Sequence, residues 1–307
     1  MRVGFMGRTQ MLLDTIKQVA QSDEHEVAFI WTSKAEAFYH CDESEFEQLA
    51  TQLNCPFYYA SSVKKVQDQI DFDAVDVVIS INFINIIPQA FLERISHGVL
   101  NAHAGDLPRY KGNACPNWAI INGESQVVLS IHEMSHELDS GPIYLKRAHE
   151  LNDSVYIGDI YQWLEKAVPE GFKAALDAIQ AGKTPIAQDN TKPLRTFPRK
   201  PEDARIDWAA GPESVCRLVR ASSHPFDGAF TFLNGDEQEK VVVYRAAIIE
   251  LDYDFLAVDG QVLERRENSV LVASQNQAIE ITDCQLNGLS HSESLQRITA
   301  SLRNRLL

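Results

Sequence analysis

The stretch Val75–Ile81, with the sequence VDVVISI, decides the fold. Its apolar residues run almost continuously instead of alternating with polar ones, which is typical of a parallel strand covered by helices on both faces. Two earlier apolar runs, residues 2–6 and Val27–Trp31, flank a segment with helical periodicity. This order of strand, helix and strand predicts an α/β domain with an open, mostly parallel sheet.

The same domain continues with three more predicted strands and a long helix. The strands are Gly98–Asn101, Val127–His132 and Ile143–Lys146, the last two forming a pair. The helix covers about residues 154–180 and is interrupted by Pro169. An earlier helix, Ser44–Leu53, is predicted to begin with Ser44 as its N-cap and Glu47 as the capping-box partner.

A change in composition marks the end of this domain. Residues 182–202 hold four of the twelve prolines and two basic clusters, a composition typical of a linker on the surface. The predicted domains are therefore residues 1–183 and 203–307, joined by the linker 184–202. Short alternating segments between Ala229 and Asp283 predict that the second domain is mostly β, a small barrel.

The composition excludes several classes of protein. Lys plus Arg number 28 and Asp plus Glu 43, so the net charge is −15 and we expect a nucleic-acid backbone to be repelled unless a local basic patch dominates. The five cysteines include no C-x-x-C pair, which predicts buried reduced thiols instead of disulfides or a cysteine zinc site. The sequence has no signal-peptide pattern and no apolar run of about 18 residues. We expect a cytoplasmic protein without membrane insertion.

Three polar residues form the sharpest chemical pattern. Asn101 and His103 lie two residues apart at the end of a predicted strand, just before a loop rich in Gly and Pro. Side chains at that spacing share one face of a strand, and ligands bind at such strand ends in open α/β sheets. Asp139 follows 36 residues after His103 in another turn. An amide donor, an imidazole and a carboxylate suit acyl transfer to an amine. The alternative is a turn-capping Asn, a satisfied His and an Asp in an Asx-turn.

The chain resembles the formyltransferases that use N10-formyltetrahydrofolate. The resemblance rests on motifs that follow one another along most of the chain: Asn101-x-His103, Leu107-Pro108-x-Tyr110-x-Gly112, Trp118–Gly123, Leu138–Gly141, Ala204–Trp208 and His224–Phe230. It implies a catalytic triad of Asn101, His103 and Asp139. It also implies a Rossmann-like N-terminal domain and a small C-terminal domain with an OB-like open barrel.

The resemblance also suggests which residues bind the two substrates. The residues expected to bind the folate are Phe83, Ile86, Ile87, Leu107, Pro108, Tyr110 and Gly112. The residues expected to bind the acceptor are Arg8, Thr9, Gln10, Lys200 and Phe226. The first three lie where a strand meets a helix N-terminus, a place suited to anions. Helix capping, a solvated linker face and core packing are the alternatives for these five.

The acceptor is predicted from a segment in which this sequence differs from one branch of the family. Its methionyl-tRNA branch carries a basic insertion after the second strand, whereas Ser33–Glu45 is acidic overall and lacks Gly and Pro. Asn101–Asp106 and Gly112–Trp118 resemble the branch that formylates amino sugars linked to dTDP, GDP or UDP, for surface polysaccharides. We therefore expect a nucleotide-linked amino sugar as the partner and no nucleic acid, with a homodimer left open. The alternatives are a methionyl-tRNA formyltransferase and a non-catalytic module that binds folate or a nucleotide sugar.

Two further motifs do not support their usual functions. His132–His136 reads HEMSH, which binds zinc when it lies on a helix, but an apolar strand pattern runs into it. Residues four apart on a strand lie roughly 13 Å apart, too far to share one ion, so no metal is expected. Gly4 and Gly7 do not complete a G-x-G-x-x-G motif, so we do not expect a nicotinamide-dependent enzyme.

Overall fold

The computed structural model describes residues 1–36, 39–189 and 191–307, which form two compact units. The first unit comprises Met1–Gly112, Val128–His149 and Gln162–Arg195. The second comprises Asn113–Val127, Glu150–Tyr161 and Thr196–Leu307. Each unit therefore draws on three segments of the chain. The domain boundaries expected from the sequence stay a prediction.

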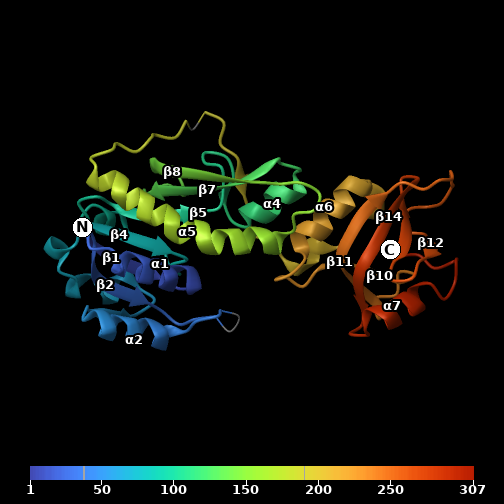
Figure 1. Ribbon diagram of the computed structural model, residues 1–307, viewed down its shortest axis with the longest axis horizontal. Helices are drawn as coiled ribbons and strands as arrows, with labels where there is room; N and C mark the ends of the chain where they lie inside the picture. The colour runs from blue at the N-terminus through green and yellow to red at the C-terminus, as the bar shows by residue number, and fades with distance from the viewer. Residues whose placement is uncertain (37–38, 190) are drawn as a thin grey trace. The chain divides into compact units, whose positions relative to one another are not determined.

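The first unit is built on a seven-stranded sheet with the order β3-β2-β1-β4-β5-β7-β8 (Figure 1). Its strands are β1 (Arg2–Gly7), β2 (Glu26–Thr32), β3 (Phe57–Tyr59), β4 (Val77–Ile81), β5 (Val99–His103), β7 (Gln126–Glu133) and β8 (Ile143–Glu150). The first five are parallel to one another, and β7 runs antiparallel to β5. The predicted α/β fold with a mostly parallel sheet is confirmed. The short strands β6 (Lys111–Gly112) and β9 (Arg195–Thr196) pair separately.

Helices cover this sheet because its central strands are apolar on both faces. Every residue of β4 is buried, as the continuous apolar run predicted. Met6, Val78 and Val99 from three neighbouring strands pack on one face together with Phe91. The helices flanking the sheet are α1 (Gln10–Ala20), α2 (Glu43–Leu53), α3 (Gln89–Leu92) and α5 (Ile157–Gln180), with 3-10 turns at Val63–Lys65, Gln67–Gln69 and Phe72–Ala74. Helix α5 runs through Pro169 without ending.

The N-cap predicted for α2 is wrong by two residues. Asp42, not Ser44, is the N-cap, and its carboxylate accepts hydrogen bonds from the Ser44 amide and hydroxyl. Glu45, not Glu47, closes the capping box on the Asp42 amide at 3.0 Å. A carboxylate at the N-cap also interacts favourably with the positive end of the helix dipole, which favours the earlier start.

The second unit is built on a five-stranded antiparallel sheet with the order β10-β11-β14-β13-β12. Its strands are β10 (Ala229–Phe232), β11 (Lys240–Ile249), β12 (Val262–Arg265), β13 (Val270–Ser274) and β14 (Gln277–Leu286), with helices α4 (Cys115–Ile121), α6 (Pro212–Ser222) and α7 (His291–Ile298) and 3-10 turns at Pro201–Ala204 and Trp208–Ala210. Its core takes Val219 from α6, Val243 and Ile279 from the sheet and Leu295 from α7. The predicted small, mostly β domain is confirmed.

One short segment joins the two edges of this sheet. Phe232 at the β10 edge exchanges backbone hydrogen bonds with Leu307 at 2.9 and 2.8 Å. At the β12 edge, the Leu306 amide donates to the Gly260 carbonyl at 2.8 Å and the Val262 amide donates to Asn304 at 3.1 Å. Residues 304–307 therefore satisfy backbone groups that an open sheet would leave unpaired.

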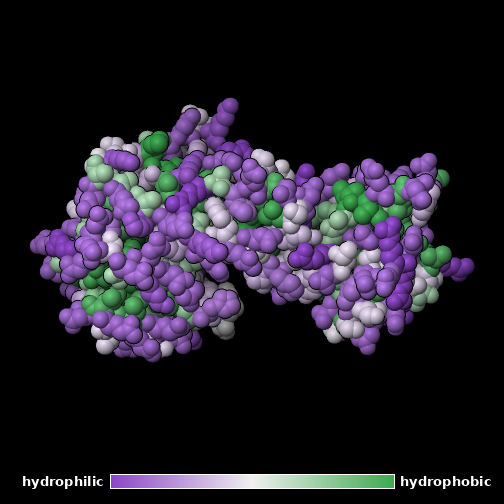
Figure 2. Space-filling model, in the orientation of Figure 1, coloured by the Kyte–Doolittle hydropathy of each residue, from purple (hydrophilic) through white to green (hydrophobic). Residues whose placement is uncertain are grey.

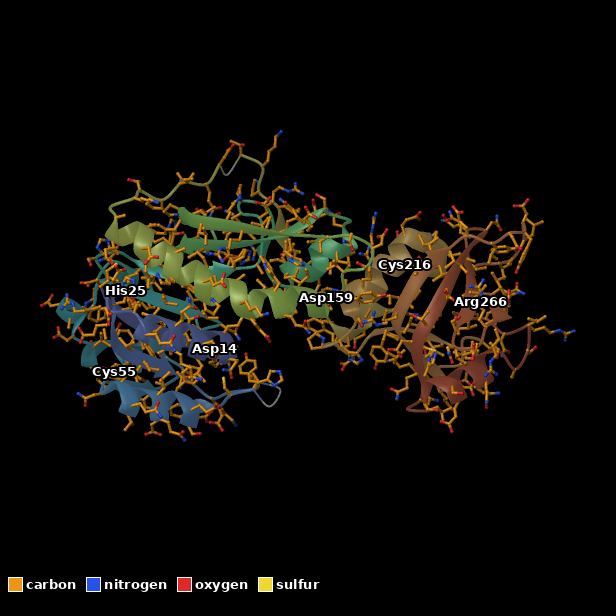
Figure 3. All side chains as sticks on the ribbon, viewed as in Figure 1. Asp14, His25, Cys55, Asp159, Cys216 and Arg266 are labelled. Atoms are coloured by element: carbon orange, nitrogen blue, oxygen red, sulfur yellow. The ribbon has the colours of Figure 1, made fainter. Side chains whose placement is uncertain are left out.

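The surface and the cysteines agree with the composition. Hydrophilic residues cover most of the face shown in Figure 2. Cys55 and Cys216 belong to different units, and both are free thiols (Figure 3). Burial raises the pKa of the Cys216 thiol to about 12, so it stays protonated at neutral pH. In the part of the chain that the structure describes, no helix combines the length and apolar character needed to cross a bilayer.

Gly260 tests the importance of the segment 304–307. A Cβ added at Gly260 lies 2.0 Å from the Leu306 carbonyl oxygen, and its φ is +79°. Gly288 has nearly the same φ, +80°, but a Cβ there meets nothing within 4 Å. Gly288→Ala should cost about 1 kcal/mol from backbone strain. Gly260→Ala should cost about 1–3 kcal/mol more, because the carbonyl must move. Urea unfolding followed by circular dichroism measures both, and equal losses would show that the segment yields freely.

Candidate active site

The antiparallel register of β5 and β7 creates the center of the site. Asn101 lies directly opposite His132, and His103 lies opposite Ser130. Because residues two apart share a face of a strand, these four side chains lie on the same side of the sheet. The Asn101 amide nitrogen is 3.4 Å from His132 Nε2. The pairing of Asn101 with His103 was predicted, whereas the place of His132 was not.

Asp139 completes the group from a turn after β7. Its Oδ2 lies 3.6 Å from His103 Nδ1, and its Oδ1 lies 3.8 Å from His132 Nε2. The Gly112 amide donates to Asp139 Oδ2 at 2.9 Å, which holds the carboxylate in place. The structure thus brings together all three residues of the predicted triad. The side chains of His103 and Asp139 are 8% and 11% exposed, so their charges interact with little screening by solvent.

His103 is oriented by its other ring nitrogen. His103 Nε2 is 2.6 Å from the Tyr110 carbonyl oxygen, which can only accept, so Nε2 donates. This bond turns Nδ1 toward Asp139. A proton carried at Nδ1 therefore faces the Asp139 carboxylate, whose Oδ2 lies 3.6 Å away.

His132 is a neutral imidazole within the same cluster. Its Nδ1 donates to the Glu133 carbonyl at 2.9 Å, so Nε2 carries the lone pair that accepts the Asn101 N–H. Burial and the neighbouring His103 lower the pKa of His132 to about 4. A neutral His132 can hold the Asn101 amide without adding a second positive charge beside His103. His132 could have been identified from its position opposite Asn101 on the neighbouring strand. That position depends on the register of β5 and β7, which the sequence does not show.

Two glycines allow the loops to approach the triad. A Cβ at Gly105 lies 2.5 Å from His103 Nε2 and 2.4 Å from the Tyr110 carbonyl oxygen. A Cβ at Gly141 lies 1.8 Å from the Glu133 carbonyl oxygen. The amide of Gln188 donates to the Asp139 and Gly141 carbonyls at 2.9 and 2.7 Å, which fixes the turn that carries Asp139. Larger side chains at either glycine would displace the groups that orient the triad.

The residues expected to bind the folate differ in exposure. Leu107, Tyr110 and Ile87 are buried at 0%, 4% and 6%, while Ile86 is 93% exposed. Phe83 packs edge-on against Trp31, with ring centroids 5.1 Å apart. Pro108 is half-buried in the loop that follows His103, and Gly112 contacts Asp139 as described above.

The residues expected to bind the acceptor lie in two places. Arg8 is 7% exposed and donates to Glu36 and to the Lys34 carbonyl, both at 3.0 Å, so its charge is already paired. Thr9 is the N-cap of α1 with φ of 112°, and its buried hydroxyl has no partner among the described residues. Gln10 donates to Asp14 at 2.8 Å. Lys200 and Phe226, by contrast, line a cavity within the second unit.

The histidines of HEMSH do not converge. His132 is buried on β7 and faces Asn101, whereas the His136 side chain is 74% exposed and lies 3.8 Å from Glu137. The motif lies at a strand end, as the sequence pattern indicated.

The shifted pKa of His132 predicts how stability depends on pH. Its folded-state value of about 4 lies below the ordinary 6.5. Between these values the unfolded chain binds a proton that the folded chain does not, so the free energy of unfolding falls as the pH drops through this window. From pH 7 to 4.5, His132→Gln should lose less stability than wild type, by on the order of 2 kcal/mol. His136→Gln, an exposed control, should behave like wild type. The free energy of unfolding is measured by urea unfolding at each pH. The same dependence on pH for all three proteins would contradict the lowered pKa of His132.

Comparisons with known proteins cover nearly the whole chain. The formyl transferase family model matches residues 1–176, and the formyl transferase C-terminal domain model matches residues 199–296. The methionyl-tRNA formyltransferase of Geobacter sulfurreducens is 28% identical over 94% of this chain and 90% of that protein. The enzyme of that name from Alkaliphilus oremlandii is 23% identical over 94% of this chain and 93% of that protein.

Solved structures share the fold at lower identity. An N-formyltransferase from Helicobacter canadensis, in complex with folinic acid and dTDP-3-aminofucose, aligns with a TM-score of 0.67 and 13% identity over 92% of this chain and 99% of that one. HypX from Aquifex aeolicus aligns with a TM-score of 0.62 and 20% identity over 97% of this chain. The chain spans about half the length of HypX, 49%.

The predicted acceptor is therefore wrong. The sequence predicted a nucleotide-linked amino sugar and no nucleic-acid partner, but relatives that match 94% of the chain are methionyl-tRNA formyltransferases. The prediction relied on the acidic segment Ser33–Glu45, on the resemblance of Asn101–Asp106 and Gly112–Trp118 to the amino-sugar branch, and on the net charge of −15, which averages over the molecule. Arg199, Lys200 and Lys240 nevertheless gather at one cavity. Local charge, not the average, decides whether a phosphate is attracted.

The two family matches follow the chain in order. The first includes β5, β7 and the Asp139 turn, and the second includes the sheet of the second unit. In the region of the first match, His103 and Asp139 lie within ion-pairing range, and Asn101 joins them through His132. The chain belongs to the formyl transferase family.

Proposed function

We propose that this enzyme transfers the formyl group of N10-formyltetrahydrofolate to the α-amine of methionine esterified to tRNA. The observation that carries the proposal is the meeting of Asn101, His103 and Asp139 in a chain whose full-length relatives are methionyl-tRNA formyltransferases. A module that only binds folate has no need for an imidazole placed against a carboxylate. Turnover with the charged tRNA separates these two functions.

The donor site is proposed to lie beside the triad on the loops after β4 and β5. The half-buried Phe83 and Pro108 offer apolar surface to it, and the buried Leu107 and Tyr110 support the loop after β5, which leads into β6 and Gly112. Ile86, which is 93% exposed, offers apolar surface next to Phe83. Apolar walls with a few polar groups at one end are typical of sites for ring-containing ligands.

The chemistry joins the amine nitrogen to the formyl carbon and breaks the bond from that carbon to folate N10. Attack requires a neutral amine and places negative charge on the formyl oxygen. Asn101 is proposed to donate its amide hydrogen bond to that oxyanion while His132 fixes the amide's orientation. The nitrogen loses a proton as the new bond forms. His103 is proposed to take up this proton at Nδ1, where Asp139 stabilises it, and a proton then returns to N10 as the folate leaves.

Asp139→Asn tests the role of the carboxylate. It keeps the size of the side chain but removes the charge that stabilises protonated His103, so kcat should fall roughly 100-fold or more with little change in KM. The basic form of His103 should also become available at lower pH, which shifts the pH profile of kcat. His103→Ala should lose a similar factor in kcat. Steady-state kinetics from pH 5.5 to 9 measure both variants, and a near wild-type rate for either would remove that residue from the mechanism.

The acceptor prediction rests on the relatives and is tested with matched substrates. Methionyl-tRNA should be formylated, and kcat/KM should fall steeply with salt because phosphate contacts release counterions. The parallel assay offers a dTDP-linked amino sugar, which has only two phosphates. Formylation of the sugar with no formylation of the tRNA at physiological salt is the contrary result.

Metal removal provides an independent check. An amine is already a nucleophile and Asn101 supplies the oxyanion donor, so exhaustive chelation should leave kcat unchanged. Activity lost on chelation and restored by one equivalent of zinc would contradict this mechanism. His136→Gln, which changes the HEMSH motif without touching the triad, should likewise retain full activity.

A further inference from the structure

A cavity of about 510 Å³ is lined entirely by residues of the second unit, and none of them belongs to the triad. This volume is within the range of roughly 300–1,000 Å³ that is typical of small-molecule sites. Its lining combines three basic side chains with three aromatic rings: Arg199, Lys200, Lys240, Tyr161, Phe226 and Phe230. Asp227 is the acidic residue at its wall. Basic residues thus outnumber acidic ones at this cavity in a chain with a net charge of −15.

Arg199 is held at the cavity by neutral oxygens. Its Nη2 donates to the Asp203 carbonyl and to the Ser222 hydroxyl, both at 3.2 Å, and its Nη1 donates to the Ala221 carbonyl at 3.5 Å. Its Nε is buried and has no hydrogen-bond partner among the described residues. None of these bonds goes to a carboxylate, so Asp203 attracts the guanidinium only through space, and the guanidinium donors form no direct ion pair with it.

The aromatic rings offer flat apolar faces beside these charges. Phe226 is 41% exposed and packs edge-on against Tyr161, with ring centroids 5.9 Å apart. Lys240 Nζ lies 4.3 Å above the Phe230 ring, which keeps the ammonium at the cavity wall. Aromatic rings next to basic side chains are the combination that stacks a base and contacts its phosphate in single-stranded nucleic-acid sites.

The loop that carries Phe226 is fixed in place. The Phe226 amide donates to Ser223 at 3.0 Å, and the Gly228 amide donates to Ser222 at 2.9 Å. The His224 ring stacks on Tyr244 with centroids 4.3 Å apart and an angle of 12°. An exposed aromatic ring on a rigid loop loses little conformational entropy when a ligand covers it.

We propose that this cavity binds one nucleotide, with its base against Phe226 and Tyr161 and its phosphate at Arg199, Lys200 and Lys240. Free phosphate would leave the rings exposed, and an uncharged ring compound would leave the three cations unpaired. A nucleotide satisfies both, whether it is free or part of a single-stranded RNA. This proposal rests only on the residues that line the cavity. It does not depend on which acceptor the active site formylates.

Equilibrium binding to the full chain tests the assignment. The probes are adenosine 5′-monophosphate, adenosine, inorganic phosphate and a single-stranded RNA hexamer, measured by calorimetry. The monophosphate should bind at least tenfold tighter than adenosine or phosphate. Hexamer binding tenfold tighter still would identify an RNA strand as the source, and monophosphate binding that the hexamer does not displace would identify a free nucleotide.

Matched variants locate the binding. Phe226→Ala and Lys240→Gln should each weaken binding about tenfold, and Lys240→Gln should lower the salt slope for the hexamer by about 1. Phe226→Tyr, which keeps the ring, should bind like wild type. Arg303→Gln removes an exposed charge of the same unit outside the cavity and serves as the control. Thermal unfolding midpoints verify that every variant is folded.

Equal affinities for wild type, Phe226→Ala and Lys240→Gln would overturn the proposal, as would no binding of any probe at millimolar concentration. Formyl transfer to methionyl-tRNA is measured on the same samples. Nucleotide binding without that transfer would contradict the proposed function alone, and transfer without nucleotide binding at the cavity would contradict this inference alone.

Discussion

The antiparallel pairing of β5 with β7 is the constraint on which the site depends. It ends a run of parallel strands and places His132 opposite Asn101. It also turns the chain so that the loop after β7 brings Asp139 within 3.6 Å of His103. A shift of one residue in the register of β7 would turn His132 and Ser130 to the other face of the sheet, away from Asn101 and His103. The fold therefore fixes the chemistry through one pair of strands, and the glycines at 105 and 141 let the surrounding loops follow it closely.

The strand pairing also determines which side chains of the site carry charge. Two imidazoles lie near one carboxylate, and their hydrogen bonds assign them different states. His132 is neutral because it is buried and donates to a backbone carbonyl, whereas His103 has its Nδ1 turned to Asp139. Two imidazolium groups at this distance would repel each other in a poorly solvated environment. The arrangement leaves one imidazole to take up a proton and the other to orient an amide.

Much of this could be predicted from the sequence, and the failures have physical causes. The apolar run Val75–Ile81 predicted a central strand because a strand that is buried on both faces has apolar residues at nearly every position. Asn101 and His103 could be paired because strand geometry is local. The role of His132 depends on a register between strands about 30 residues apart, which no local pattern encodes. The pairing of residues 304–307 with both edges of the second sheet is non-local in the same way. The acceptor was predicted wrongly because one acidic segment, two short motifs and the total charge say little about where cations gather in the folded chain.

The central claim is that formyl transfer to methionyl-tRNA occurs at a unit formed by Asn101, His103 and Asp139. The most direct test is the single-turnover rate of formyl transfer from N10-formyltetrahydrofolate to methionyl-tRNA by wild type, Asn101→Ala, His103→Ala and the double variant. Groups that act as a unit are non-additive, so the double variant should be nearly as active as the slower single variant. Formyl transfer by the double variant near the wild-type rate, or no formyl-methionine from wild type, would contradict the account.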